Sequence, residues 1–112
     1  MTTESATSLS FEIEESVDEQ NWKCTTIICH GRLVSSSAAL LKDLVKPLIE
    51  RGGHIIIDCG DLAHVDSSGL GVLITLKVSA LNKGYCTLEL THLTSRIVEL
   101  LKLTHLSQFF SR

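Results

Sequence analysis

The sequence predicts an α/β protein with a single domain, in which three or more helices pack on a central sheet of four to five strands, mixed but mostly parallel. Short apolar runs typical of strands alternate with helical segments of ten or more residues, and this alternation is the pattern of β-α-β units. The chain has 112 residues, which is enough to bury one hydrophobic core but not two.

The N-terminal third predicts a tail and two strands. Residues 1–10, "MTTESATSLS", are rich in Ser and Thr and poor in large apolar side chains. We therefore expect a flexible tail there and a folded domain over 11–112. From Phe11, "FEIEESV" alternates apolar and acidic residues, as an edge strand with one wet face does. The next segment, "WKCTTIICHGRL", is apolar and β-branched on both faces, which predicts a more central strand.

The segment "SSSAALLKDLVKPLIERGG" predicts the first helix. Its three serines, Ser35 to Ser37, are N-cap residue types, its apolar residues form one stripe, and two glycines end it. Pro47 lies inside this helix and lacks the N–H that the helix needs there. We expect a bend near Asp43 to Lys46, or a helix that restarts.

The C-terminal half predicts two further strand and helix pairs. "HIIIDCG" is a short apolar strand bounded by glycines, as at the centre of a parallel sheet, and an apolar helix follows from about Ser67 to Leu81. "YCTLELTHL" predicts another strand, and "TSRIVELLKLTHL" predicts a last amphipathic helix capped by Thr94 or Ser95. In such sheets ligands and partners meet the carboxyl ends of the strands, where we place "DCGDLAHVDSSGLG" in a turn.

The composition excludes several classes of protein. The chain is 44% hydrophobic and 21% charged, and its formal net charge is -3. With its Lys and Arg residues scattered singly, it offers no basic surface for nucleic acid or for an anionic membrane. No run approaches the roughly 18 apolar residues of a membrane helix, and no basic and apolar leader begins the chain. We expect no membrane insertion and a cytoplasmic location.

The cysteines and histidines do not predict a metal site or a bound cofactor. The four cysteines have no CxxC spacing and lie mostly in apolar runs. Small buried hydrophobic residues are therefore the favoured interpretation, and a disulfide or a metal site is the lesser one. The five histidines show no HxxxH or HxH pairing, which argues against zinc.

The stretch "HVDSSGLG", residues 64–71, places two glycines at the start of an apolar helix, where each costs about 1 kcal/mol relative to alanine. Asp66 or Ser67 can cap the helix, but capping does not explain the glycines. A helix N-terminus favours negative charge, and a serine there is a good phosphate acceptor. Glycines beside it would let another protein approach the main chain closely. We therefore interpret this stretch as a phosphorylation and partner-binding site.

Catalytic interpretations of the same stretch have less support, and we expect no enzyme. The glycine spacing matches neither GxxxxGK[ST] nor GxGxxG, and no GxSxG surrounds Ser67 or Ser68. Asp58 would be the phospho-accepting aspartate of a receiver domain only if further acids stood at an earlier strand end. That strand end has the sequence "IICHG".

The chain resembles the STAS domain, the family named for sulfate transporters and anti-sigma factor antagonists. The segment "IIIDCGDLAHVDSSGLGVLITL" has the family's apolar strand, its Asp-x-x-x-Leu spacing and its Asp-Ser-Ser-Gly-Leu-Gly signature. "GRLVSSSAALLKDL" is similar to the glycine turn and first helix, and "SRIVELLKLTHLSQFF" to the closing helix. The resemblance covers about Phe11 to Phe110 and implies a single STAS-type domain.

The resemblance implies a phospho-regulated anti-sigma factor antagonist. Single-domain members bind a serine-kinase anti-sigma factor while unphosphorylated. The kinase then phosphorylates the serine after the motif's Asp, with its own ATP, and this ends the binding. By position that acceptor is Ser67, with Ser68 next in line. The predicted partner-binding surface comprises Arg32, Ser36, His64, Asp66, Ser67, Ser68, Gly69 and Gly71.

Two residues depart from the family pattern. Similar members often have Gly-Glu-Leu-Asp before the first helix, where this chain has Gly31, Arg32, Leu33 and Val34. An acid near the acceptor is thus replaced by Val34. Arg32 reverses a charge and is suited to pair with a phosphate there.

Two other functions remain open. The chain is alternatively a scaffold subunit of a signalling complex or of a transporter-associated assembly, or it binds a small molecule or nucleotide at the same turn. We expect a monomer or a weak dimer. Among the serines, Ser68 is a candidate second cap or helix-face hydroxyl, and Ser35 to Ser37 are candidate N-caps.

Overall fold

A computed structural model of the protein describes residues 9–103. Strand β1 spans Leu9–Val17, so two residues assigned to the expected tail belong to the sheet. They pair with the neighbouring strand, Leu9 opposite Gly31 and Ser10 opposite His30. Leu9 is itself a buried core residue, and its burial explains why the strand starts early. The rest of the predicted tail, residues 1–8, lies outside the described residues.

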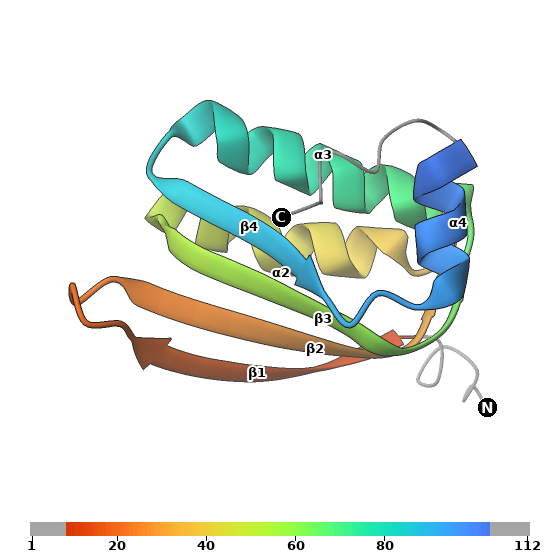
Figure 1. Ribbon diagram of the computed structural model, residues 1–112, viewed down its shortest axis with the longest axis horizontal. Helices are drawn as coiled ribbons and strands as arrows, with labels where there is room; N and C mark the ends of the chain where they lie inside the picture. The colour runs from red at the N-terminus through yellow and green to blue at the C-terminus, as the bar shows by residue number, and fades with distance from the viewer. Residues whose placement is uncertain (1–8, 104–112) are drawn as a thin grey trace.

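The sheet has four strands in the order β1-β2-β3-β4. Strand β2 spans Lys23–Leu33, β3 spans Gly53–Val65 and β4 spans Cys86–Thr91. β1 is antiparallel to β2, whereas β2, β3 and β4 are parallel. The predicted mixed, mostly parallel α/β sheet is confirmed, with β1 at an edge and β2 inside (Figure 1).

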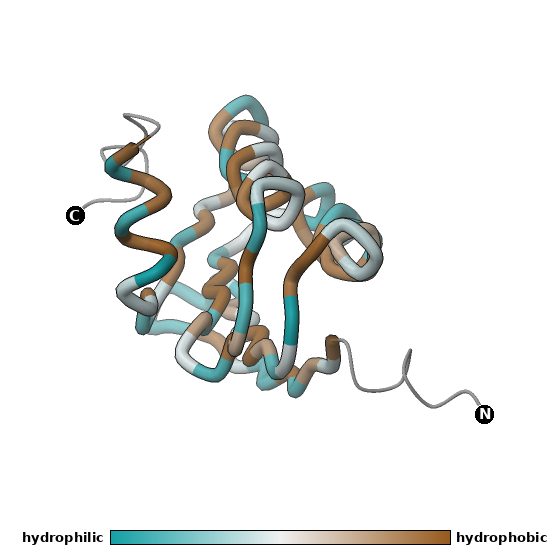
Figure 2. The backbone as a smooth tube through the Cα atoms, turned by 90° about the vertical axis from the view of Figure 1, so that its right-hand side faces the viewer, coloured by the Kyte–Doolittle hydropathy of each residue, from teal (hydrophilic) through white to brown (hydrophobic). Residues whose placement is uncertain are grey.

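Helices α2, Ala38–Arg51, and α3, Ser67–Lys83, lie side by side on one face of the sheet (Figure 1). Figure 2 looks along these helices and shows brown, apolar segments recurring along helices and strands between teal, polar ones. The inward positions of β2, β3 and β4 are buried, among them Ile27, Ile57 and Leu88. Leu41 of α2 and Leu73 of α3 cover them. The buried residues that alternate along the strands and the apolar stripes of the helices thus pack together in one core.

Helix α2 runs unbroken through Pro47, so the predicted restart is wrong. Pro47 is exposed, while Val45 and Ile49 on either side of it are buried. The packed apolar stripe holds the helix together even though one backbone hydrogen bond is missing.

Strand β3 is longer than expected. It continues past the predicted end at Gly60 as far as Val65, so "DLAHV" lies in a strand and not in a turn. After a register shift between Ile28 and His30 of β2, pairing with β3 resumes at Asp61. Leu62 and Val65 are buried and anchor this extension in the core.

The last helix, α4, spans Ser95–Leu103 and packs through buried Ile97 and Leu101. Thr94 caps it, since its Oγ1 accepts a hydrogen bond from Ile97 N at 3.3 Å. The rest of the predicted closing helix lies outside the described residues. Among the helices of residues 9–103, none has the length and apolar character that crossing a membrane requires.

The four cysteines are unpaired. Cys29, Cys59 and Cys86 are buried and Cys24 is half-buried. Their expected role as small hydrophobic residues is confirmed for the three buried ones, and the disulfide alternative is wrong.

Candidate phosphorylation and partner-binding site

Asp66 occupies the N-cap of α3 in an extended conformation and joins two turns. Its Oδ1 accepts a hydrogen bond from Gly69 N at 2.9 Å, and its Oδ2 accepts one from Ser35 N at 3.1 Å. The hydrogen bond from Gly69, followed by those from Ser35 and Ser68, lowers the pKa of Asp66 below its ordinary value. One ionised carboxylate therefore ties the start of α3 to the turn that precedes α2.

The two turns lie side by side because β2 and β3 end next to each other. In the parallel register Arg32 lies opposite His64, and Leu33 lies opposite Val65. One residue further, Asp66 N donates a hydrogen bond to Leu33 O at 3.3 Å. Because both strands end at the same edge, residues more than 30 positions apart in sequence share one surface there.

Ser67 and Ser68 are the first two residues of α3, and both are exposed. They stand at the positive end of the helix dipole, where added negative charge is tolerated. Asp66 is half-buried and Gly69 is buried. The other predicted partner-binding residues are exposed: Arg32, Ser36, His64, Ser67, Ser68 and Gly71.

The two glycines of the motif serve different purposes, which corrects the expectation that both leave room for a partner. A Cβ on Gly69 would overlap the carbonyl oxygen of Leu33 and lie 2.9 Å from the Leu33 Cγ. Gly69 is therefore needed inside the fold, where α3 packs on the end of β2. A Cβ on Gly71 would meet nothing within 4 Å, so only Gly71 leaves space on the outer surface.

The serines before α2 also act differently from the predicted caps. Ser37 stands at the N-cap but makes no side-chain capping hydrogen bond. Its buried hydroxyl accepts a hydrogen bond from Val34 N at 3.1 Å and lies 2.6 Å from Arg32 O, to which it donates. Ser35 contributes its backbone N–H to Asp66. Val34, where the family resemblance leads us to expect an acid, is 8% exposed and belongs to the buried hydrophobic residues.

Sequence reasoning missed Leu33 and Ser37 as parts of the site. The contribution of Leu33 is a backbone oxygen, which any residue type would supply, so the pattern carried no signal for it. The "SSS" run was the available signal for Ser37, but it does not say which serine is buried. Within residues 9–103, no cluster of three or more His, Cys, Asp or Glu side chains is arranged to hold a metal ion.

Comparison with known proteins places this geometry in a family. The model of the STAS domain family matches residues 11–112. The anti-sigma-B factor antagonist of Bacillus subtilis (strain 168) is 32% identical over 89 residues, which are 79% of this chain and 80% of that protein.

Solved structures share the fold at lower identity. An anti-sigma factor antagonist from Mycobacterium paratuberculosis matches with a TM-score of 0.73 at 16% identity, covering 92% of this chain and 83% of that one. The anti-sigma factor antagonist SpoIIAA in its unphosphorylated form matches with a TM-score of 0.70 at 18% identity, covering 91% and 86%. By its sequence match and its fold, the chain belongs to the STAS domain family.

Proposed function

We propose that this protein is an anti-sigma factor antagonist that binds a serine-kinase anti-sigma factor while Ser67 is unphosphorylated, and releases it once Ser67 is phosphorylated. The sequence relative from Bacillus subtilis is named an anti-sigma-B factor antagonist, which supports the antagonist part of this proposal. In this proposal the chain is a cytoplasmic binding protein, a monomer or weak dimer, without catalysis or cofactor of its own.

The observation that carries the proposal is the placement of Ser67. Its side chain is exposed at the first position of α3, and it stands beside the only glycine of the motif that leaves open space, Gly71. A kinase active site can reach such a hydroxyl without unfolding the helix. Arg32, Ser36 and His64 are exposed on the neighbouring turn and strand ends and extend the proposed contact surface around it.

Phosphorylation at this position changes the surface but not the fold. A phosphoserine adds about -1.5 to -2 charges and three acceptor oxygens. The helix N-terminus stabilises this charge, so α3 stays intact. A partner that packs closely against the helix start must then desolvate the phosphate. A cost of about 2.8 kcal/mol is enough to weaken binding a hundredfold.

The test uses two matched variants, Ser67→Ala and Ser68→Ala, which remove neighbouring exposed hydroxyls from the same helical turn. Each is incubated with ATP and a serine-kinase anti-sigma factor from the same organism, and phosphate incorporation is measured by mass spectrometry. We expect Ser68→Ala to be modified as the parent is and Ser67→Ala to stay unmodified. If Ser67→Ala is modified equally, the assignment of the acceptor is wrong.

Binding is measured on the same proteins by isothermal titration calorimetry. We expect unphosphorylated protein and Ser67→Ala to bind the anti-sigma factor, and the phosphorylated protein to bind about a hundredfold more weakly or less. If the phosphorylated and unphosphorylated forms bind equally, the switch is refuted. A protein that binds no anti-sigma factor in either form would instead support the scaffold function.

A further inference from the structure

A hollow lies at the end of the sheet opposite to Ser67. It has a volume of about 460 Å³ and is lined by the β1–β2 turn, the junction of α2 with β3, and Tyr85, the residue before β4. Its side chains include Gln20, Asn21, Trp22, Lys23, Arg51 and Tyr85. Strand β3 begins here and runs 13 residues before the Ser67 end, which is roughly 40 Å at 3.3 Å per residue. The two sites are therefore separate (Figure 1).

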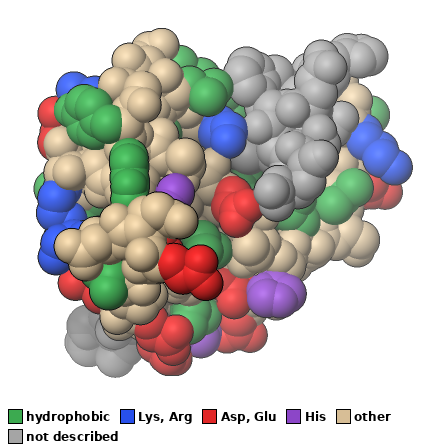
Figure 3. All heavy atoms as spheres, turned by 60° about the vertical axis from the view of Figure 1, so that its left-hand side comes forward, with side chains coloured by type: hydrophobic (Ala, Val, Ile, Leu, Met, Phe, Trp, Pro, Cys, Tyr) green, Lys and Arg blue, Asp and Glu red, His purple; other side chains and the backbone are tan. Residues whose placement is uncertain are grey.

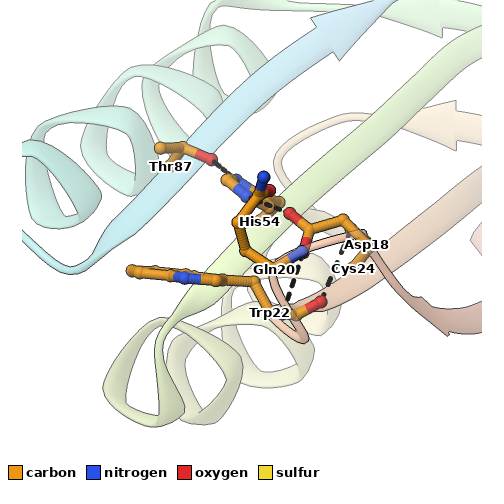
Figure 4. A network of polar contacts seen from close by, with 6 residues as sticks. All are labelled: Asp18, Gln20, Trp22, Cys24, His54 and Thr87. Atoms are coloured by element: carbon orange, nitrogen blue, oxygen red, sulfur yellow. Dashed lines mark hydrogen bonds and ion pairs between the residues drawn. The ribbon is translucent and has the colours of Figure 1, made fainter.

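Trp22 is exposed and yet held in place (Figure 4). It is 43% exposed, and its ring stacks on the ring of His54 with centroids 5.5 Å apart. His54 is fixed in turn, with Nδ1 at 2.7 Å from Thr87 Oγ1 and Nε2 at 3.1 Å from Asp18 Oδ2. Asp18 Oδ1 also accepts hydrogen bonds from the backbone N–H groups of Trp22 and Gln20, both at 2.9 Å.

His54 stacks on one face of the indole ring, and the 43% exposed Trp22 side chain lines the hollow. An exposed aromatic side chain that is already ordered loses little conformational entropy when a ligand stacks on it. The network therefore positions Trp22 as a wall of the hollow.

Two cationic side chains stand beside this wall. Arg51 donates one hydrogen bond from Nη2 to Thr25 Oγ1 at 3.1 Å and lies 3.6 Å from Glu15 Oε2. Its guanidinium has five N–H donors, and the two contacts with Thr25 and Glu15 both use Nη2. Lys23 is exposed and takes part in none of the ion pairs that join residues 9–103. Figure 3 turns this end of the molecule forward and shows Lys and Arg side chains at its left margin, with acidic side chains both among and below them.

Two glycines allow the backbone on the remaining side of the hollow to pack closely against its neighbours. Gly52 and Gly53 have φ angles of +89° and +102°, which disfavour other residues. A Cβ on Gly52 would lie 2.9 Å from the Tyr85 ring, and a Cβ on Gly53 would lie 2.6 Å from Lys23 O. Gly53 N also donates a hydrogen bond to Tyr85 O at 3.1 Å. The backbone here is thus packed against both Tyr85 and Lys23, which sets the shape of the hollow.

We propose that this hollow binds a planar aromatic anion. Its ring would stack on Trp22, with Tyr85 at the other side, and its carboxylate or phosphate would meet Lys23 and Arg51. A volume of about 460 Å³ falls within the range of small-molecule sites. The aromatic walls supply apolar contact area, and the guanidinium fork with the lysine ammonium selects for the anion.

The chain contains a single tryptophan, so the indole N–H resonance of Trp22 reports on this hollow in a ¹⁵N–¹H spectrum. Two probes separate the anion sources, 2-naphthoate and 2-naphthyl phosphate, and 2-naphthol is the uncharged control. We expect saturable shifts of the Trp22 resonance with a Kd near 1 mM for at least one anion, as for a ligand of this size. The anion that binds with the lower Kd shows whether the hollow prefers a carboxylate or a phosphate.

Two results with the probes would overturn the proposal. One is the absence of saturable shifts with either anion up to about ten times that concentration. The other is equal affinity for 2-naphthol, since the cations would then contribute nothing.

Charge-matched variants test the assigned residues. We expect Lys23→Gln to weaken binding of the better probe about fivefold, which is the effect of one exposed ion pair. Lys46→Gln removes an exposed lysine of α2 that does not line the hollow and should bind as the parent does. Equal affinity of these two variants would refute the role of Lys23. Ser67→Ala should leave probe binding unchanged, so failure of the hollow and failure of the proposed switch are told apart.

Discussion

Gly69 at the start of α3 lies so close to the backbone of Leu33 at the end of β2 that no side chain fits between them. A Cβ at position 69 would overlap the Leu33 carbonyl oxygen and stand 2.9 Å from the carbonyl carbon. The same oxygen accepts the hydrogen bond from Asp66 N. This contact fixes the distance between the start of α3 and the end of β2, and with it the position of Ser67.

The two glycines of the motif should respond in opposite ways to alanine. We expect Gly69→Ala to lower the free energy of unfolding by about 2–3 kcal/mol, because the overlapped atoms belong to the backbone and cannot rotate away. Gly71→Ala should raise it by up to about 1 kcal/mol, because alanine is the better helix former and nothing lies within 4 Å. Urea unfolding followed by circular dichroism measures both. Changes of the same sign would contradict the different roles assigned to these glycines.

Gly71 also gives a test of close partner approach that does not depend on phosphorylation. Gly71→Leu places a bulky side chain on the exposed surface and should leave the fold intact, since the position is open. We expect it to weaken binding of the anti-sigma factor by about tenfold or more, through a steric clash in a packed interface. Calorimetric titration measures the loss of affinity. Gly84→Leu is not a suitable control, because Gly84 has a φ of +79°. Thr75→Leu, exposed one turn further along α3, is the suitable control, and an equal effect there would argue against a contact at Gly71.

Asp66 should stabilise the fold in a pH-dependent way. Its folded pKa is lowered, chiefly by the hydrogen bond from Gly69 and then by that from Ser35. The stabilisation is therefore present above the unfolded pKa of about 3.9 and is lost as the pH falls through the folded pKa. We expect Asp66→Asn, which keeps one acceptor oxygen but loses the second, to lower the Tm by roughly 5 °C near pH 7.

The difference in Tm between the parent and Asp66→Asn should shrink as the pH falls below about 4. Differential scanning calorimetry over that range measures it. Asp43→Asn, on the exposed face of α2, is the control and should show no such trend. A difference for Asp66→Asn that stays constant with pH would mean that the ionised carboxylate is not what stabilises the junction.

His30 should give the opposite dependence on pH. It contacts Asp61 through Nδ1 and lies 2.8 Å from Glu12 Oε2 through Nε2. The hydrogen bond to Asp61, followed by that to Glu12, raises the pKa of His30. Its stabilisation is then fully present below the unfolded pKa of about 6.5 and is lost as the pH rises through the folded pKa.

We expect His30→Gln to lower the Tm by a few degrees at about pH 6, with the gap to the parent narrowing toward pH 9. Thermal unfolding at several pH values measures this. His64→Gln, which removes an exposed histidine without contacts to Glu12 or Asp61, is the control. A gap that widens with pH would show that His30 stabilises the fold as the neutral form.

The cysteines should differ sharply in reactivity. Burial raises the pKa of Cys29 and of Cys59 to about 12, so at pH 8 both thiols are almost entirely in the unreactive protonated form. Cys24 is half-buried, and we expect it to react first with a disulfide reagent. The buried pair should react at least about a hundredfold more slowly. Mass spectrometry of the folded protein measures the rate at which each cysteine reacts, and protein unfolded in urea is the control. Equal rates for Cys24 and the buried pair in the folded protein would contradict their difference in burial.

Much of the fold follows from local patterns. Alternating apolar and acidic residues identified β1, and apolar or β-branched runs identified the inner strands. Apolar stripes with cap residues identified the helices, because these patterns depend only on neighbouring positions. The start of α3 at Ser67 was predicted from Asp66 and the serines in the same way. The sequence left a bend and a restart open at Pro47, because what holds α2 together there is packing of its buried stripe on the sheet.

Local patterns and the motif thus decide the order of the elements, the family and the choice of Ser67 as the candidate acceptor. Tertiary structure alone assigns Gly69 to packing against Leu33, ties Asp66 to Ser35, and extends β3 to Val65. The physical reason is that these contacts join residues about 30 positions apart. Their distances depend on how parallel strands align and not on any neighbouring sequence.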